Sequence, residues 1–360
     1  MNAPPSIQRD EQRNVLTCAA ALQTLGSFSD IIDVRSPAEY AHDHIPGALS
    51  APVLDDAQRI LIGTLHKQDS AFAAKRRGAV LVARNIATHI ETLFCDKPRD
   101  WQPLVYCWRG GQRSGAMTHV LAKVGWRARQ LEGGYRAYRR QVLADLETLP
   151  QQFQWRVITG STGSGKSRLL GHIATAGGQA LDLEALACHR GSVLGGLPHA
   201  PQPSQKMFES KLWDALRRFD TRRPIYVESE SRKVGELRLP DALMACMRSA
   251  PCLRLELPLS ERIALLRADY AHYELDPRAL IAQLKCLTAL HGHQRINEWI
   301  VLIEAGQWPQ LVEQLLVQHY DPAYERSMRG NFMQVAQARV LSPANSGDEA
   351  LSALARNLVA

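Results

Sequence analysis

The stretch GSTGSGKS at residues 160–167 decides the fold of the second half of this 360-residue chain. It matches G-x-x-x-x-G-K-S in full, and it lies between an apolar run over 155–159 and a helix-forming stretch over 166–176. A strand, a glycine-rich turn and a helix in that order form a P-loop, whose backbone N–H groups surround a phosphate. We therefore predict a phosphate or diphosphate site built from Gly160, Gly163, Ser164, Gly165, Lys166 and Ser167.

Acidic residues follow two further predicted strands of this half, over 179–183 and 225–227. Glu228 stands where P-loop NTPases usually have aspartate, so the sequence supports phosphate binding better than hydrolysis. A role as metal ligand or base and a role as helix cap or ion-pair partner are equal alternatives for these carboxylates. The Ser167 hydroxyl suits Mg²⁺, although the sequence defines no certain metal site. The candidate substrate or metal residues are Asp182, Glu184, His189, Arg190, Glu228 and Glu230.

A second anion-binding loop, CWRGGQRS over 107–114, lies about fifty residues earlier. The apolar run 104–107 predicts a strand that ends at the cysteine, and 115–124 predicts a helix after the loop. Two glycines let successive backbone N–H groups turn towards one point, which stabilises an anion. These amides and the nearby arginines favour the thiolate form of the cysteine. The candidate catalytic residues are Cys107, Arg109 and Arg113.

The length of the chain exceeds what one hydrophobic core usually serves, so we expect two domains. Short apolar runs alternate with helix-forming stretches, which predicts an α/β fold with parallel strands. The expected domains span 10–148 and 153–345, with 149–152 as the linker. From Ser260 onward the pattern predicts mainly helices, over 260–272, 277–290, 293–305 and 308–318.

Composition restricts the compartment and the partners. No run of eighteen apolar residues occurs, so we expect a cytoplasmic protein without a membrane segment. Seven cysteines without a CxxC pair indicate neither a disulfide framework nor a zinc ribbon. A formal net charge of +7 is compatible with RNA as a partner and equally with a solvated basic surface.

Three motifs of the first half resemble the signatures of rhodanese domains. DVRSPAEY at 33–40 and HIPGA at 44–48 resemble their opening signature, and LEGGY at 131–135 resembles their closing signature. In rhodaneses the loop cysteine carries a persulfide or a similar chalcogen, and the resemblance assigns that place to Cys107. Arg113 follows after five intervening residues, a spacing longer than in common sulfurtransferases and shared with rhodanese-like phosphatases.

The order of motifs along the whole chain resembles tRNA 2-selenouridine synthases, a bacterial family that modifies the wobble uridine. DLExLAxHRGS at 182–192, ESRKVG at 230–235 and HYDPAY at 319–324 add to the two loops. The resemblance implies a rhodanese-like parallel-sheet domain followed by a P-loop NTPase-like α/β domain with a helical C-terminal part. It also implies a transferase that geranylates 5-substituted 2-thiouridine with geranyl diphosphate and then replaces the geranylthio group with selenium from selenophosphate. The implied partners are the tRNA anticodon region and both small substrates, with a selenophosphate synthase as a candidate protein partner and no tightly bound cofactor.

This chemistry would divide the work between the two loops. A P-loop can stabilise the departing diphosphate of an allylic ester without hydrolysing ATP. A thiol in a ring of amides is suited to hold or relay a soft chalcogen anion. Apolar side chains near the P-loop should accommodate the terpenyl tail, but the sequence does not identify them.

Two other functions remain compatible with the same residues. The C-x5-R spacing and the complete P-loop would suit a cysteine phosphatase fused to a small-molecule kinase, although Trp108 and Arg109 place bulk where a phosphate ester must enter. The other alternative is a nucleotide-sensing regulator whose rhodanese-like unit only binds a partner. An intact Cys107 argues against it, because inactive rhodanese modules often lack the cysteine.

Overall fold

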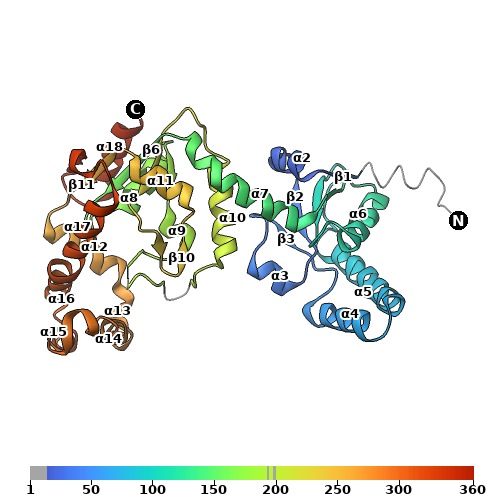
Figure 1. Cartoon of the computed structure of the whole chain (residues 1–360), viewed down its shortest axis with the longest axis horizontal. Helices are drawn as coiled ribbons and strands as arrows, with labels where there is room; N and C mark the ends of the chain where they lie inside the picture. The colour runs from blue at the N-terminus through green and yellow to red at the C-terminus, as the bar shows by residue number, and fades with distance from the viewer. Residues whose placement is uncertain (1–13, 193, 198–199) are drawn as a thin grey trace. The chain divides into compact units, whose positions relative to one another are not determined.

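The computed structural model describes residues 14–192, 194–197 and 200–360 (Figure 1). The chain forms two units, one of residues 14–145 with Glu209–Asp214 and one of Leu146–Phe208 with Ala215–Ala360. Residues 10–13 of the first expected domain lie outside the described residues. Each unit is built on its own five-stranded sheet.

The first unit contains a parallel sheet with the strand order β1-β5-β4-β2-β3. Its strands are short, and all four residues of the central strand β4 are buried, as expected for a strand with both faces covered. The core includes Ile32 and Val105 from the sheet, Ile86 from α5, and Met117 and Leu121 from α6. The elements are β1 (Val15–Leu16), α2 (Cys18–Gln23), η1 (Leu25–Ser27), β2 (Asp30–Asp33), α3 (Pro37–His42), β3 (Leu49–Ser50), α4 (Asp56–Gln68), α5 (Ala71–Thr92), β4 (Pro103–Tyr106), α6 (Gln112–Val124), β5 (Arg129–Leu131) and α7 (Gly134–Thr148).

The second unit contains another parallel sheet, with the order β12-β11-β6-β8-β7. The P-loop follows β6 at the centre of this sheet and leads into α8. Leu169 and Ile173 of α8 pack with Ala355 of α18 against the sheet residues Ile158 and Leu253. The elements up to the last two strands of the sheet are η2 (Leu149–Gln152), β6 (Trp155–Thr159), α8 (Lys166–Thr175), β7 (Gln179–Leu181), α9 (Leu183–Ala187), α10 (Gln205–Leu216, of which 209–214 are assigned to the first unit), β8 (Ile225–Glu228), the hairpin strands β9 (Lys233–Val234) and β10 (Leu237–Arg238), and α11 (Asp241–Ser249).

A helical part is inserted between the last two strands of this sheet. Tyr273, Leu284, Trp299 and Leu311 belong to its own apolar cluster. A π-helical turn, η3, connects α16 to α17. The elements are β11 (Cys252–Leu255), α12 (Leu259–Asp269), α13 (Ala271–Leu275), α14 (Pro277–Lys285), α15 (Thr288–Glu304), α16 (Trp308–Leu315), η3 (Leu316–Tyr320), α17 (Asp321–Asn331), η4 (Val335–Gln337), β12 (Arg339–Leu341) and α18 (Asp348–Val359).

The structure confirms the predicted fold class, with differences in the C-terminal part. Strands occur at 129–131 and 155–159 as predicted. The helix expected over 260–272 is two helices, because the chain leaves the helical conformation at Tyr270. The part expected to be mainly helical also supplies β12, which extends the sheet beside β11.

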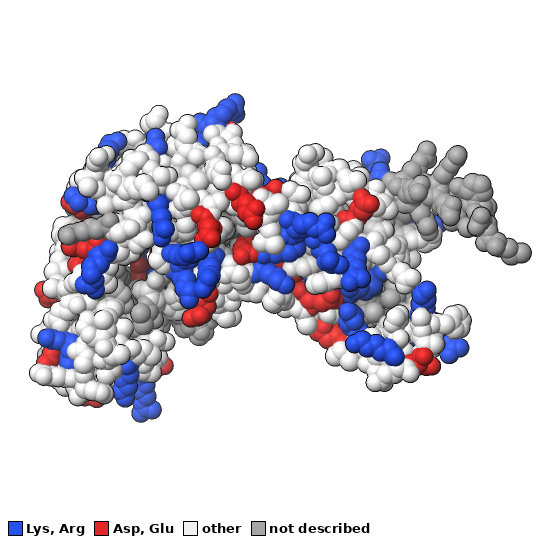
Figure 2. All heavy atoms as spheres, viewed as in Figure 1, with Lys and Arg blue, Asp and Glu red and all other residues white. Residues whose placement is uncertain are grey.

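Charged side chains of both signs lie among uncharged residues on the visible face of the molecule (Figure 2). Figure 2 shows Lys and Arg gathered in several clusters on the visible face, with Asp and Glu between them. Among the described residues, no helix is long and apolar enough to cross a membrane.

Candidate active site: a cysteine loop and a phosphate loop

Cys107 is the first residue after β4, and its side chain is buried. The Ser114 hydroxyl, on the first turn of α6, donates a hydrogen bond to Cys107 Sγ at 3.1 Å. Gln130 on β5 fixes the loop from the side, because its Nε2 donates to the Gly110 carbonyl at 2.6 Å and to Ser114 Oγ at 3.0 Å. A donor already aimed at the sulfur stabilises negative charge there.

The closing signature packs directly against the cysteine loop. Gly134 has φ +55°, and a Cβ atom at this position would lie 2.2 Å from the Cys107 carbonyl oxygen. The backbone N–H of Tyr135 donates to that same carbonyl at 2.8 Å. Only glycine permits both the left-handed conformation and the close approach. The motif at 131–135 is therefore needed to build the cysteine loop.

The opening signature supports the same loop through charge. Arg35 is buried and pairs with Asp33, whose carboxylate accepts from Arg35 Nε at 3.0 Å. Glu39 pairs with Arg113 at 2.9 Å. Burial alone would raise the pKa of Glu39, but the Arg113 guanidinium lowers it overall. Of the three predicted catalytic residues, Arg113 is thus held by Glu39, whereas Arg109 is exposed.

The ring of Trp108 forms one border of the cysteine loop. It stacks on Tyr135 with 5.2 Å between ring centroids, and the Tyr135 hydroxyl donates to Asp43 at 2.6 Å. Trp108 itself remains 36% exposed. An aromatic face of this kind beside a buried thiol is suited to stack on a planar base.

The P-loop has the expected form between β6 and α8, with Gly163 and Gly165 at positive φ. Lys166 Nζ donates to the Gly160 carbonyl at 2.7 Å, so the lysine lies over its own loop. Ser164 Oγ is buried and makes no hydrogen bond within the described part of the chain. An arriving anion would therefore have to draw Lys166 away from a loop carbonyl.

Four predicted carboxylates meet beside the P-loop. The Ser167 hydroxyl donates to Glu184 Oε2 at 2.8 Å. Glu228 Oε1 accepts from the backbone N–H of Leu183 at 2.5 Å and of Glu184 at 2.9 Å, so it ties β8 to the start of α9. Asp182 caps the same helix by accepting from Ala185 N at 2.7 Å. Glu228 and Asp182 thus accept from backbone N–H groups at the start of α9, which is the capping role that the sequence left open beside a role at a metal or as a base.

The carboxylates destabilise one another's charge. Burial raises the pKa of Glu228, and the negative charges of the neighbouring acids raise it further. Burial and the charge of Glu184 raise the pKa of Glu230 to about 7, with Lys166 opposing the shift. Glu184 and Glu230 share a hydrogen bond. A carboxyl group with a pKa near neutral pH is a candidate proton donor or acceptor.

The oxygen atoms of Ser167 and the carboxylates beside the P-loop are of the kind that Mg²⁺ binds. No three His, Cys, Asp or Glu side chains among the described residues are arranged to hold a metal ion. Ser167 and Glu184 nevertheless offer two adjacent oxygens, and Mg²⁺ usually takes one or two protein ligands together with phosphate oxygens and water.

His189 and Arg190 have different surroundings, although they are neighbours in the sequence. Burial lowers the pKa of His189, which is half-buried. Arg190 donates to the Asp269 carbonyl at 2.5 Å and lies over the Tyr270 ring at 4.6 Å from its centroid. Arg190 therefore supports the turn between α12 and α13.

Three residues near the P-loop were not among the predicted site residues. Tyr324 on α17 accepts a hydrogen bond from Gly160 N at 2.6 Å, and its ring lies 5.6 Å from Lys166 Nζ. Arg262 on α12 donates to the Thr162 carbonyl at 2.9 Å and pairs with Asp321 at 2.6 Å. Asp321 and Tyr324 belong to the HYDPAY motif, which was the available sequence signal.

Two hollows border the P-loop. A larger one with mixed lining, about 1340 Å³ and partly open to solvent, includes Gly160, Ser164, Arg254 and Tyr324. The other is apolar and reaches Thr162. An anion on the P-loop would thus have space on either side.

These two sites define a class of protein in which a rhodanese-like domain is joined to a P-loop domain. The family described as "Rhodanese-like domain" matches residues 17–141, and the one described as "tRNA 2-selenouridine synthase AAA domain" matches residues 153–295. A relative from Hydrogenovibrio crunogenus named tRNA 2-selenouridine synthase is 30% identical over 83% of this chain and 89% of its own length. The chain belongs to the tRNA 2-selenouridine synthase family.

Further relatives named tRNA 2-selenouridine synthase align over a smaller share of this chain. The one from Nitrosomonas europaea is 35% identical over 67% of this chain and 63% of its own length, and the one from Marinobacter nauticus is 37% identical over 67% and 65%. The chain thus spans slightly less than two thirds of these relatives in the alignments. Among solved structures, the N-terminal domain of a putative ATP/GTP binding protein from Clostridium difficile 630 covers 36% of this chain and 98% of its own, with 31% identity and a TM-score of 0.31. A TM-score that low adds nothing to the family assignment.

Proposed function

We propose that this protein is a transferase that converts 5-substituted 2-thiouridine at the wobble position of tRNA to 2-selenouridine through an S-geranylated intermediate. Membership of the tRNA 2-selenouridine synthase family supports this proposal. The observation that carries it is the presence, in one chain of that family, of a complete P-loop and a buried thiol that already receives a hydrogen bond.

The first step would take place at the P-loop. The sulfur of 2-thiouridine bonds to the terminal allylic carbon of geranyl diphosphate, the carbon–oxygen bond breaks, and diphosphate leaves. Lys166 and the loop amides would stabilise the negative charge that develops on the leaving group. Glu230 would take up the proton that the base loses. Ser167 and Glu184 would hold a Mg²⁺ ion, which would supply further positive charge for the leaving group.

The second step would involve the cysteine loop. Selenium of selenophosphate bonds to C2 of the base, geranylthiolate leaves, and water cleaves the phosphorus–selenium bond to release phosphate. Cys107 and the amides of its loop would hold the chalcogen anion, with Arg109 supplying mobile positive charge. The face of Trp108 would stack on the modified base.

The basic surface suits a tRNA partner. Lys and Arg exceed Asp and Glu by seven in the whole chain, and clusters of basic side chains are visible in Figure 2. Such clusters would bind the phosphate backbone around the anticodon. A cytoplasmic location and contact with a selenophosphate synthase belong to the same proposal.

Mass spectrometry of tRNA nucleosides tests the proposed reaction. Purified protein is incubated with 2-thiouridine-containing tRNA and geranyl diphosphate, with and without selenophosphate. We expect a geranylated nucleoside in the first mixture and its conversion to the selenium form in the second. An unchanged nucleoside, with folded protein and intact tRNA, would overturn the proposal and direct attention to phosphorylated small molecules.

A further inference from the structure

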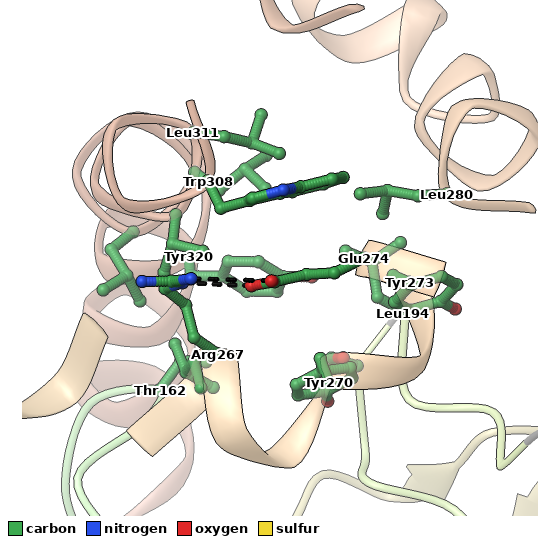
Figure 3. A pocket seen from close by; sticks show the side chains of 15 residues that line it. Thr162, Leu194, Arg267, Tyr270, Tyr273, Glu274, Leu280, Trp308, Leu311 and Tyr320 are labelled. Carbon is green, nitrogen blue, oxygen red and sulfur yellow. Dashed lines mark hydrogen bonds and ion pairs between the residues drawn. The ribbon is translucent and has the colours of Figure 1, made fainter. Parts of the chain in front are cut away.

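An apolar hollow opens beside the P-loop in the second unit (Figure 3). It contains about 600 Å³ of space not filled by protein atoms, part of it open to solvent, and its lining is predominantly apolar, as is usual for small-ligand sites. Helices α12, α13, α14 and α16 and the turn η3 surround it. Its lining includes Leu266, Tyr270, Leu280, Trp308, Leu311 and Tyr320.

The hollow is continuous with the phosphate loop. Thr162, the third residue of the P-loop motif, is part of its lining. The next residue, Gly163, lies so close to α12 that a Cβ atom there would be 2.9 Å from Leu266 Cδ1. Leu266 also lines the hollow. A ligand anchored by phosphate on the loop could therefore extend directly into this space.

The polar groups of the lining are engaged with one another. Arg267 Nε pairs with Glu274 Oε1 at 3.0 Å, and Figure 3 shows this pair beside Tyr320. Burial raises the pKa values of Tyr270 and Tyr320, while a hydrogen bond with Ser192 opposes the shift for each hydroxyl. A nucleotide base needs hydrogen-bonding partners, whereas these groups already have partners. The lining fits a hydrocarbon better.

One segment links the hollow to the support of the P-loop. The turn η3 brings Leu316 and Tyr320 into the lining, and such π-helical turns are frequent at functional sites. The next residue, Asp321, pairs with Arg262, which in turn holds the Thr162 carbonyl. The wall of the hollow and the support of the phosphate loop thus come from adjoining residues of one segment.

We propose that this hollow is the subsite for the hydrocarbon tail of a diphosphate ester whose diphosphate lies on the P-loop. The inference rests on the proposed function and names the side chains that receive the tail. An aliphatic chain of about ten carbons gains free energy here by leaving water, and the P-loop needs only to hold its charged end. The walls also limit the length of the chain.

A substitution that adds bulk to the hollow distinguishes binding of the hydrocarbon tail from binding of the diphosphate. Val312 on α16 lines the hollow and is half-buried, so Val312→Phe fills space there without touching the P-loop. Val301→Phe on α15 is the matched control, because Val301 is 60% exposed and lies outside the lining. Dissociation constants are measured by calorimetry for inorganic pyrophosphate, dimethylallyl diphosphate, geranyl diphosphate and farnesyl diphosphate.

We expect the wild type to bind geranyl diphosphate at least tenfold more tightly than pyrophosphate. Val312→Phe should lose about tenfold or more of the geranyl diphosphate affinity, since a hydrophobic pocket discriminates about 10- to 200-fold per methylene group, and should keep its pyrophosphate affinity within twofold. Trp308→Ala, which enlarges the hollow, should shift the preference towards farnesyl diphosphate. Val301→Phe should match the wild type.

Two results would overturn the subsite. One is equal affinity of the wild type for pyrophosphate and geranyl diphosphate. The other is that Val312→Phe and Trp308→Ala both keep the wild-type ratio of the affinities for pyrophosphate and geranyl diphosphate. Thermal unfolding confirms that both variants are folded. Failure of the reaction is distinguishable, because tail-dependent binding without geranyl transfer to tRNA would retain the subsite and reject the proposed function.

Discussion

The cysteine loop and the phosphate loop differ in how far their hydrogen bonds are already arranged. Around Cys107, hydrogen bonds to atoms of the loop are donated by the Ser114 hydroxyl, the Gln130 amide and the Tyr135 N–H. At the P-loop, Lys166 is bound to a carbonyl of its own loop. Glu228 Oε2 is also buried without a hydrogen bond among the described residues. The first loop is preorganised, whereas the second must exchange contacts when an anion arrives.

This difference shows how two anion sites in one chain can serve different ligands. A preorganised loop loses little free energy on binding and suits a small anion that must be held at one atom. A loop that releases its lysine on binding couples occupancy to the presence of a strongly charged ligand such as a diphosphate. The following substitutions would break or sharpen that contrast, from the largest expected effect to the smallest.

Removal of the thiol tests the first loop. Cys107→Ala should reduce conversion of geranylated tRNA to the selenium form by about 1,000-fold or more, because a reacting group is lost. Geranylation should stay within about threefold of the wild type. Nucleoside mass spectrometry measures both steps, with the exposed Cys95→Ala as the control. Loss of both steps in a folded Cys107→Ala protein would contradict the separation of roles.

Removal of the lysine tests the second loop. Lys166→Ala should slow geranyl transfer by about 100- to 1,000-fold, the usual loss when a group that stabilises transition-state charge is deleted. Selenation of tRNA that is already geranylated should continue. The matched control is Lys285→Ala, an exposed lysine on α14. Geranyl transfer at the wild-type rate would show that the diphosphate does not bind on the P-loop.

The preorganisation of the cysteine loop can be disturbed at Gly134. Gly134→Ala should lower the free energy of unfolding of the first unit by about 2 to 4 kcal/mol, since the methyl group meets the Cys107 carbonyl and the backbone is left-handed. Gly47→Ala is the control for backbone strain alone, because Gly47 has φ +82° and no atom within 4 Å of its Cβ position. We expect it to cost about 1 kcal/mol. Equal effects in urea unfolding would contradict the close-contact explanation.

The raised pKa of Glu230, beside the P-loop, should make the stability of the protein depend on pH. The pKa of Glu230 is raised to about 7 from an ordinary value of 4.5. The folded state therefore keeps a proton that the unfolded chain releases, so the contribution of Glu230 to stability falls as pH rises from about 4.5 to about 7. The stability of the wild type relative to Glu230→Gln should decline by up to about 3 kcal/mol over that range.

Urea unfolding of wild type, Glu230→Gln and the exposed control Glu304→Gln, at several pH values, measures this decline. Parallel pH profiles for the wild type and Glu230→Gln would mean that the carboxylate pair does not retain its proton. A flattened profile in Glu304→Gln would point to a general charge effect instead.

The sequence predicted both loops because each is local. The glycine and lysine positions of 160–167 and the cysteine and glycines of 107–114 are recognisable within eight residues each. The fold class followed from the same strand–loop–helix patterns. The supports of the P-loop could not be derived in this way, because Arg262 and Tyr324 reach it from 100 and 164 positions away. No local pattern encodes such contacts.

Strand β12 shows the same limit. Arg339–Leu341 is three residues long and follows a run of helices, so its period is too short to distinguish it from a loop. Its pairing with β11 depends on tertiary structure. The acidic cluster was only half predictable, since its residues were recognisable but their mutual closeness raises the pKa values in a way that spacing along the chain does not reveal.

The place of β12 and α18 at the far end of the chain has a consequence for synthesis on the ribosome. The P-loop sheet gains its edge strand and the helix that packs on α8 only when residues 339–359 have been made, about 170 to 190 residues after the P-loop itself. At about 5 to 20 residues per second, the nascent P-loop would wait about 10 to 40 seconds for these partners. The P-loop unit therefore matures late, and its exposed sheet edge is the part of the nascent chain that a chaperone would most need to protect.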